Sequence, residues 1–150
     1  MERATVYRHR LPHWRVHKAA YFVTWRLHSL QRDLAPAERT AVLNAIKYFE
    51  GERYDLIAYV VMNDHVHVLF SPVESRRVQD LIHTWKSFTA NALQRTGRVG
   101  SVWQDEYFDR VMRNDEELLE KANYIVANPW KRWPDGADYE WVGIRGNSEP

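Results

Sequence analysis

The chain has 150 residues, 45% of them hydrophobic, and a net charge of +1 from 21 Lys and Arg against 20 Asp and Glu. This length and composition predict one folded domain with its own core and exclude a disordered chain. The absence of cysteine excludes disulfides and thiolate metal sites, and no apolar run approaches membrane-spanning length. We therefore expect a soluble cytoplasmic protein.

The basic residues gather near the two ends of the chain. Residues 1–18 hold five cations against a single acidic residue: Arg3, Arg8, Arg10, Arg15 and Lys18. Residues 130–133 (WKRW) place Lys131 and Arg132 between two tryptophans. Cations interleaved with aromatic rings suit phosphates and stacked bases, whereas the simpler alternative is a solvated arm and a surface patch.

The first half of the chain predicts a strand, a helix and a hairpin in that order. Residues 20–27 (AYFVTWRL) are rich in β-branched and aromatic residues, which favour a strand. Residues 36–52 begin with proline and space their apolar residues as a helix does. Residues 54–62 and 65–70 predict two strands joined by an Asn-Asp turn.

The second half predicts two helices on either side of a strand. Apolar residues recur at helical spacing over residues 78–93, and a strand is expected within residues 102–112. Asn114 is a suitable residue to begin the last helix, since acidic residues fill the turn after it. We expect that helix to end at Asn128, because Pro129 disfavours α geometry in the residue before it.

The order of elements predicts an α+β protein. A hairpin between two helical connections is typical of the ferredoxin-like βαββαβ fold, a four-stranded antiparallel sheet, here with an appended C-terminal helix that carries Tyr124. We interpret residues 1–150 as one domain, with a basic arm over 1–18, a core over 19–130 and a tail over 131–150.

Two histidines alternate with a valine in the second strand of the hairpin. Because side chains alternate along a strand, His65 and His67 share one face and Val66 lies on the other. The spacing would let both imidazoles bind one divalent metal ion. The alternative is a pair of ordinary histidines at the rim of the core.

A tyrosine lies on the polar side of the last helix. Glu117, Lys121, Tyr124 and Asn128 follow one another at i, i+4, i+7 and i+11, beside the apolar stripe that should face the sheet. Tyr124 is either a functional residue or an amphipathic tyrosine at the core boundary.

Several segments in order resemble the single-tyrosine HUH transposases of bacterial insertion sequences, and most closely the REP-associated tyrosine transposases. They are YFVTWRL (21–27), YVVMNDHVHVLF (59–70), LIHTWKSFTA (81–90), GSVWQDEYFDRVMR (100–113) and YIVANP (124–129). The resemblance implies a nuclease and strand transferase that cuts single-stranded or hairpin DNA, such as repetitive palindromes. It implies Tyr124 as nucleophile, forming a 5′-phosphotyrosine, with His65, His67 and Asn128 as ligands of Mg²⁺ or Mn²⁺.

Other residues receive DNA-binding roles by position or resemblance. Lys86 is expected to hold a phosphate or to lie along its helix. The WQ-x-x-Y segment resembles that of the family and is expected to contact unpaired bases, although its tryptophan could equally belong to the core. The predicted DNA contacts are Lys86, Trp103, Gln104, Tyr107, Arg110, Arg113, Lys131, Arg132, Arg8, Arg10 and Arg15. The chain departs from the family pattern at Asp64, where relatives usually carry Asn, and at WKRW.

Two other functions remain open from the sequence. One is a module that binds DNA palindromes without cutting them. The other is an unrelated metallohydrolase that uses His65 and His67 with Asp64 or Asp109. Nothing in the sequence indicates a self-complementary interface, so we expect a monomer, associated with the nucleoid when bound to DNA.

Overall fold

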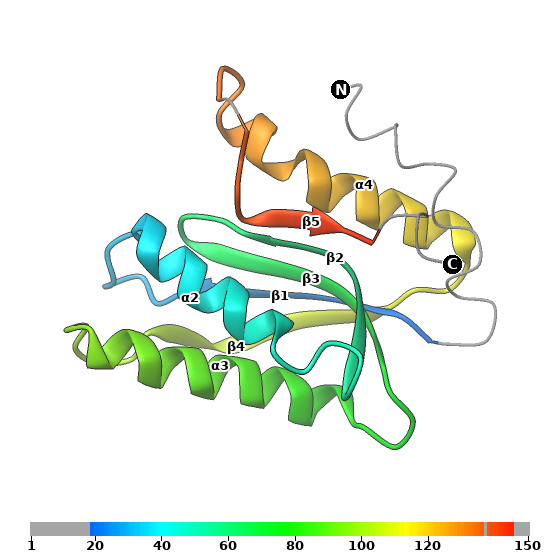
Figure 1. The fold of residues 1–150 in the computed structure, drawn as a ribbon, viewed down its shortest axis with the longest axis horizontal. Coiled ribbons are helices and arrows are strands. Elements are labelled where there is room, and N and C mark those ends of the chain that lie inside the picture. Colours follow the sequence, from blue (N-terminus) through cyan, green and yellow to red (C-terminus); the bar gives the residue numbers. More distant parts are fainter. Residues whose placement is uncertain (1–18, 137, 146–150) are drawn as a thin grey trace.

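The computed structural model describes residues 19–136 and 138–145, which form an α+β fold (Figure 1). The elements in chain order are β1 (Tyr21–Leu27), α2 (Pro36–Lys47), β2 (Tyr54–Val61), β3 (His65–Pro72), α3 (Val78–Arg95), β4 (Trp103–Val111), α4 (Asp115–Arg132) and β5 (Val142–Ile144). In this part of the chain no helix is both long and apolar enough to cross a membrane.

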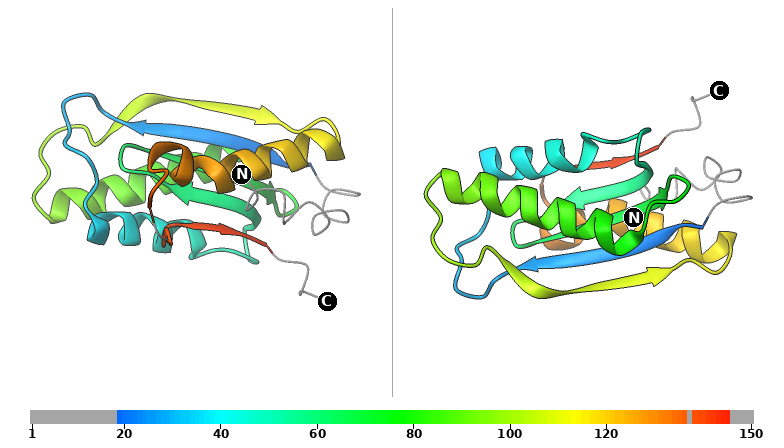
Figure 2. Two further views of the ribbon diagram at one scale, coloured as in Figure 1. Left: turned by 90° about the horizontal axis from the view of Figure 1, so that it is seen from above. Right: turned by 90° about the horizontal axis from the view of Figure 1, so that it is seen from below.

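The strands form one antiparallel sheet in the order β4-β1-β3-β2-β5. Its first four strands have the order of the ferredoxin-like fold, so the predicted fold class is confirmed. Helices α2 and α3 cover one face of the sheet and α4 crosses the other (Figure 2). The central strands β1 and β3 are therefore covered on both faces.

The alternation of side chains along β1 and β3 divides the core into two layers. Trp25 and Val66 belong to the layer under α2 and α3, where the indole of Trp25 stacks on that of Trp85 with centroids 5.8 Å apart. Phe22 and Leu69 belong to the layer under α4. This alternation directs the histidines of β3 toward α4.

Helix α4 is longer than the sequence predicted. It does not end at Asn128 but continues to Arg132, with Pro129 inside it. A proline removes one backbone donor, yet the last turn still closes, because the N–H of Trp133 donates to the carbonyl of Pro129 at 2.7 Å. Pro129 is also buried, so its packing offsets the missing hydrogen bond.

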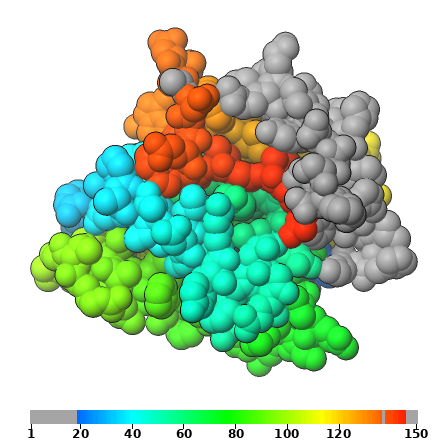
Figure 3. Space-filling model, in the orientation of Figure 1, coloured from blue at the N-terminus to red at the C-terminus, as the bar shows by residue number. Residues whose placement is uncertain are grey.

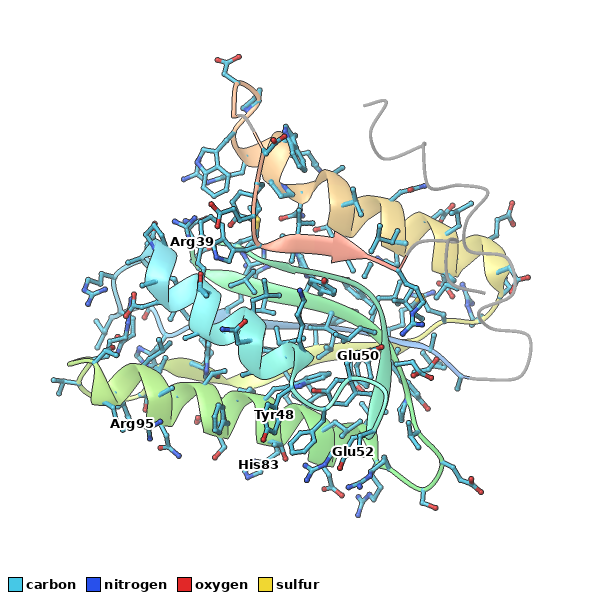
Figure 4. All side chains as sticks on the ribbon, in the orientation of Figure 1. Arg39, Tyr48, Glu50, Glu52, His83 and Arg95 are labelled. Carbon is cyan, nitrogen blue, oxygen red and sulfur yellow. The ribbon has the colours of Figure 1, made fainter. Side chains whose placement is uncertain are left out.

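The C-terminal segment adds a fifth strand that the sequence did not predict. Strand β5 pairs with β2, and the segment forms a continuous band between α2 and α4 (Figure 3). The hydroxyl of Tyr139 donates to the carbonyl of Val61 at 2.6 Å, and the guanidinium of Arg39 lies 4.9 Å from the ring centroid of Trp141 (Figure 4). Part of the predicted tail thus belongs to the folded core.

A buried ion pair joins the loops at one end of the sheet. Arg98, between α3 and β4, donates to both carboxylate oxygens of Glu38 on α2, at 2.7 and 2.8 Å. It also donates to the carbonyls of Arg32 and Asp33 at 2.8 and 2.9 Å. The guanidinium of Arg98 holds the pKa of Glu38 at about 2, well below its usual range.

Candidate active site

The two histidines lie side by side on the α4 face of β3. The ring centroids of His65 and His67 are 4.7 Å apart, with an interplanar angle of 72°. Val66 between them packs in the opposite layer of the core. The predicted alternation is confirmed, and it brings two imidazoles into one site.

Each histidine is held through its Nδ1 atom. Thr24, directly opposite on β1, places its Oγ1 atom 2.7 Å from Nδ1 of His67. Asp64 places a carboxylate oxygen 2.8 Å from Nδ1 of His65. A partner at Nδ1 fixes the ring and leaves Nε2 as the nitrogen available to a ligand, as in histidines that bind metal ions.

The Nε2 atom of His67 has the environment of a metal ligand. It is buried and has no hydrogen-bond partner in the part of the chain that the structure describes. Burial, and then the charges of His65, Arg26 and Lys121, lower the pKa of His67 from 6.5 to about 3. The ring is therefore neutral at physiological pH, and a ligand at Nε2 would relieve a buried polar atom that is costly to leave unpaired.

Helix α4 brings Tyr124 to the histidines. The side chain of Asn114 begins the helix by accepting a backbone N–H of the first turn at 2.8 Å. One face of α4 then packs into the core, and Tyr124 lies beside that face, 39% exposed. Its ring centroid is 5.4 Å from that of His67. The phenol thus touches the histidine site and remains open to a substrate.

Phe22 and two lysines complete the surroundings of Tyr124. Phe22 stacks on His67 with centroids 5.3 Å apart and meets Tyr124 edge-on at 6.2 Å. The ammonium groups of Lys121 and Lys131 lie 5.4 and 5.1 Å from the centroid of the Tyr124 ring. Two cations beside the phenol make this site attractive to a phosphate.

A cleft of about 450 Å³ opens in front of these groups, between β1, β4 and α4. Residues of these three elements and of β3 line it, among them Thr24, His67, Gln104, Phe108, Lys121 and Tyr124. Its volume is typical of sites that hold molecules the size of a nucleotide. The cleft joins the histidine, the tyrosine and a lysine in one accessible space.

Asn128 follows Tyr124 by one turn of α4 and is nearly buried, at 9% exposed. Residues four apart share a helix face, so Asn128 is on the same side of α4 as Tyr124. Neutral imidazoles and an amide oxygen suit a divalent ion of the Mn²⁺ or Mg²⁺ kind. With the unpaired Nε2 of His67, these residues fit a divalent metal.

Asp64 and Asp109 were the two carboxylates considered as metal ligands together with His65 and His67, and neither is placed for that role. Asp64 is engaged with Nδ1 of His65. Asp109 pairs with Val23 on the opposite face of the sheet and lines a hollow beside α3. Within residues 19–136 and 138–145, no three His, Cys, Asp or Glu residues lie close enough to hold a metal ion. The geometry does not support the histidine–carboxylate hydrolase.

The residues of the WQ-x-x-Y segment divide between core and cleft. Trp103 is 5% exposed and donates its indole N–H to Thr89 at 2.9 Å, which is the packing role left open by the sequence. Gln104 and Tyr107 line the cleft. Lys86 donates to two backbone carbonyls at the start of β4, at 2.7 and 2.9 Å, and its pKa is lowered by burial.

The remaining predicted DNA contacts have mixed surroundings. Arg110 and Arg113 both form ion pairs with Glu117, at 3.5 Å for Arg113. Arg132 lies over the indole of Trp133, and Lys131 lies beside the ring of Tyr124. Three predicted contacts lie outside the described residues: Arg8, Arg10 and Arg15.

Sequence reasoning missed two residues of this site. Thr24 gives no local signal, because only the β1–β3 register places it opposite His67. Lys121 does give one, since it precedes Tyr124 by three residues and so shares its helix face. Neither was predicted as a site residue.

The fold and the site define a class: α+β domains with a histidine pair on the central sheet opposite a tyrosine on a covering helix. A family model described as "Transposase IS200 like" matches residues 16–128, and the chain belongs to this family. The resemblance inferred from the sequence motifs is thereby confirmed.

Individual relatives agree with this assignment. A REP-associated tyrosine transposase of Escherichia coli K12 is 22% identical over 112 residues, which are 74% of this chain and 66% of that protein, slightly less than two thirds of its length. A solved structure of a REP-associated tyrosine transposase bound to a REP hairpin is 19% identical, with a TM-score of 0.70 over 86% of this chain and 80% of that one. A putative transposase from Deinococcus radiodurans R1 is 20% identical, with a TM-score of 0.53 over 75% and 92%.

Proposed function

We propose that this protein is a metal-dependent endonuclease and strand transferase that cuts single-stranded or hairpin DNA through a covalent bond to Tyr124. One observation carries the proposal: the half-exposed phenol of Tyr124 contacts His67, whose buried Nε2 atom has no hydrogen-bond partner among the described residues. Membership of the Transposase IS200 like family supports it.

The chemistry follows from the groups around the cleft. The phenolic oxygen of Tyr124 attacks a backbone phosphorus and loses its proton, while the bond from phosphorus to the 3′ oxygen breaks and that oxygen takes up a proton. Lys121 and Lys131 hold the charge of the phosphate. The product is a 5′-phosphotyrosine with a free 3′-hydroxyl, which can attack the linkage and rejoin a strand.

His65, His67 and Asn128 would hold the Mg²⁺ or Mn²⁺ ion. When bound, such an ion neutralises charge on the phosphate and polarises its oxygens. Thr24 and Asp64 keep the two imidazoles in position through Nδ1.

The substrate that we propose is a DNA hairpin formed by a repeated palindrome, with unpaired nucleotides at its foot. The E. coli relative is named for REP elements, and the solved relative is bound to a REP hairpin. Gln104 and Tyr107, which line the cleft, would contact the unpaired part. Such a substrate places the protein at the nucleoid, in the bacterial cytoplasm.

A second candidate is a hairpin-binding protein that does not cut. The hairpin bound to the solved relative favours recognition without by itself requiring cleavage. Formation of a covalent adduct distinguishes the two candidates.

The test uses labelled single strands that carry palindromes of the source genome, with Mg²⁺ or Mn²⁺, and a denaturing gel. We expect a protein–DNA adduct that is absent with Tyr124→Phe and His67→Ala. Tyr48→Phe is the matched control, because Tyr48 is an exposed tyrosine directly after α2, on the other side of the sheet (Figure 4). Tight binding without an adduct in either metal would leave the binding protein as the function.

A further inference from the structure

Phe108 is an exposed aromatic side chain on β4, the edge strand of the sheet that the described residues form. Its ring is 54% exposed, and it lines the cleft that contains His67 and Tyr124. Single exposed apolar side chains are common on protein surfaces, but this ring faces the cleft that holds the candidate site, where a bound strand could cover it.

Aromatic contacts connect Phe108 to the reacting groups. Its ring meets that of Phe22 edge-on with centroids 6.2 Å apart, and Phe22 meets Tyr124 edge-on at the same distance. Phe22 also stacks on His67 at 5.3 Å. Phe108 is therefore two ring contacts from the nucleophile, close enough to meet a nucleotide next to the one that is cut.

The wall formed by β4 suits a base better than a phosphate. It lines the cleft with Gln104, Glu106, Tyr107 and Phe108, none of which is a cation. The cleft-lining cation of α4, Lys121, has its ammonium group 4.7 Å from the ring centroid of Phe22. Arg26 of β1 also lines the cleft, so a strand there can direct its phosphate toward Lys121 and Arg26 and a base toward β4.

We propose that Phe108 forms a subsite on which one unpaired nucleobase, adjacent to the cut phosphate, stacks. This inference rests on the proposed function. It adds to that function the part of the DNA strand, one stacked base, that positions the phosphate before Tyr124. Stacking accepts any base, because each base has a π face, so the subsite fixes position rather than sequence.

The test measures DNA binding by fluorescence anisotropy in a Tyr124→Phe background, which prevents cutting. Strands are compared with an abasic nucleotide placed in turn at each position flanking the cut. We expect Phe108→Ala to bind the intact strand about tenfold more weakly than the protein that keeps Phe108. At one position, an abasic nucleotide should weaken the binding of the protein that keeps Phe108 by the same factor, and it should not change the binding of Phe108→Ala. Phe108→Trp should restore binding, and 2-aminopurine at that position should be quenched only when an aromatic ring is present.

Phe88→Ala is the matched control, since Phe88 is an exposed phenylalanine on α3 and lines the groove between α2 and α3 instead. The subsite would be overturned if Phe108→Ala bound DNA as tightly as the protein that keeps Phe108. It would also be overturned if Phe108→Ala weakened binding by the same factor on the intact strand and on every abasic strand. Adduct formation is measured in parallel with the Tyr124 protein. If an adduct forms but either of these two binding results is found, only the subsite is contradicted. If neither an adduct nor DNA binding is found, the proposed function is contradicted, and the subsite with it.

Discussion

Thr24 and Asp64 determine the orientation of the two histidine rings of β3. Each holds one imidazole at Nδ1, at 2.7 and 2.8 Å, so that Nε2 becomes the free atom of the ring. The family resemblance led us to expect Asn where this chain has Asp64, and either side chain offers an oxygen to an Nδ1–H donor. The departure from the family pattern thus keeps the orienting hydrogen bond.

Replacing Thr24 by valine tests this orienting role. The side chain keeps its shape but loses the oxygen beside Nδ1 of His67, so we expect about a tenfold loss of metal affinity. The measurement is the rate of adduct formation as a function of Mn²⁺ concentration. Thr24→Ser restores the hydroxyl and should restore the rate, and an unchanged Mn²⁺ dependence in Thr24→Val would contradict the role.

The residues that could be predicted from the sequence are those whose placement depends on local periodicity. His65 and His67 share a face because of strand alternation, and Tyr124 stands on the open side of α4 because of helical spacing. Thr24 could not be predicted, because its position opposite His67 depends on pairing between strands far apart in the chain. The burial of Trp103 likewise depends on Thr89 of α3, which the local sequence does not specify.

At the scale of elements, α4 determines the geometry of the site. It begins at a capping side chain, Asn114, and carries Tyr124 and Asn128 over the sheet. Its final turn beyond Pro129 positions Lys131 beside the ring of Tyr124. The sequence rule for proline predicted an earlier end, because the rule takes no account of the tertiary burial of Pro129.

The cap of α4 should contribute to stability but not to chemistry. Asn114→Ala leaves a backbone N–H of the first turn without its acceptor, so we expect the free energy of unfolding to fall by about 1 kcal/mol. Urea denaturation measures this change, and Asn114→Asp should show little of it. The folded variant should form the adduct at the normal rate, and a large loss of rate would show that the cap also positions Tyr124.

Strand β5 escaped prediction for a different reason. It has only three residues, too few for an alternating pattern, and it is held by tertiary contacts of Tyr139 and Trp141. The basic WKRW segment, which the sequence left open as a DNA contact or a surface patch, contributes Trp133 to that cluster, where it stacks on Tyr139 at 5.5 Å.

For the whole molecule, the pair of Arg98 and Glu38 joins three segments that are distant in sequence. It connects the loop before β4 to the start of α2 and to the carbonyls that precede it. The pKa of Glu38 is about 2 in the folded protein, below its ordinary value of 4.5. The pair therefore stabilises the fold fully above pH 4.5, and this stabilisation is lost as the pH falls through about 2.

Glu38→Gln should be less stable than the unaltered protein by about 3 kcal/mol at neutral pH, because the change leaves a buried guanidinium without its counter-charge. The difference should shrink as the pH falls below 4.5. Unfolding in denaturant at pH 7, 5, 4 and 3 measures it, with the exposed Glu52→Gln as control (Figure 4). A difference that stays constant down to pH 3 would show that the charge of Glu38 is not its source.

One chain supplies both sides of the candidate site, since His67 and Tyr124 are in contact within it. We therefore expect a monomer to form the adduct. Mixing Tyr124→Phe protein with His67→Ala protein should recover no activity, and light scattering should report the mass of one chain. Recovery in the mixture would mean that the tyrosine of one chain serves the histidines of another.

The most direct measurement is the identity of the residue that carries the DNA. After reaction with a palindromic strand and digestion of the DNA by nuclease, trypsin should release residues 122–131, whose only tyrosine is Tyr124. Mass spectrometry should find a nucleotide attached to that tyrosine, and no such peptide from His67→Ala protein. A strand that is cut while residues 122–131 carry no nucleotide would contradict the account.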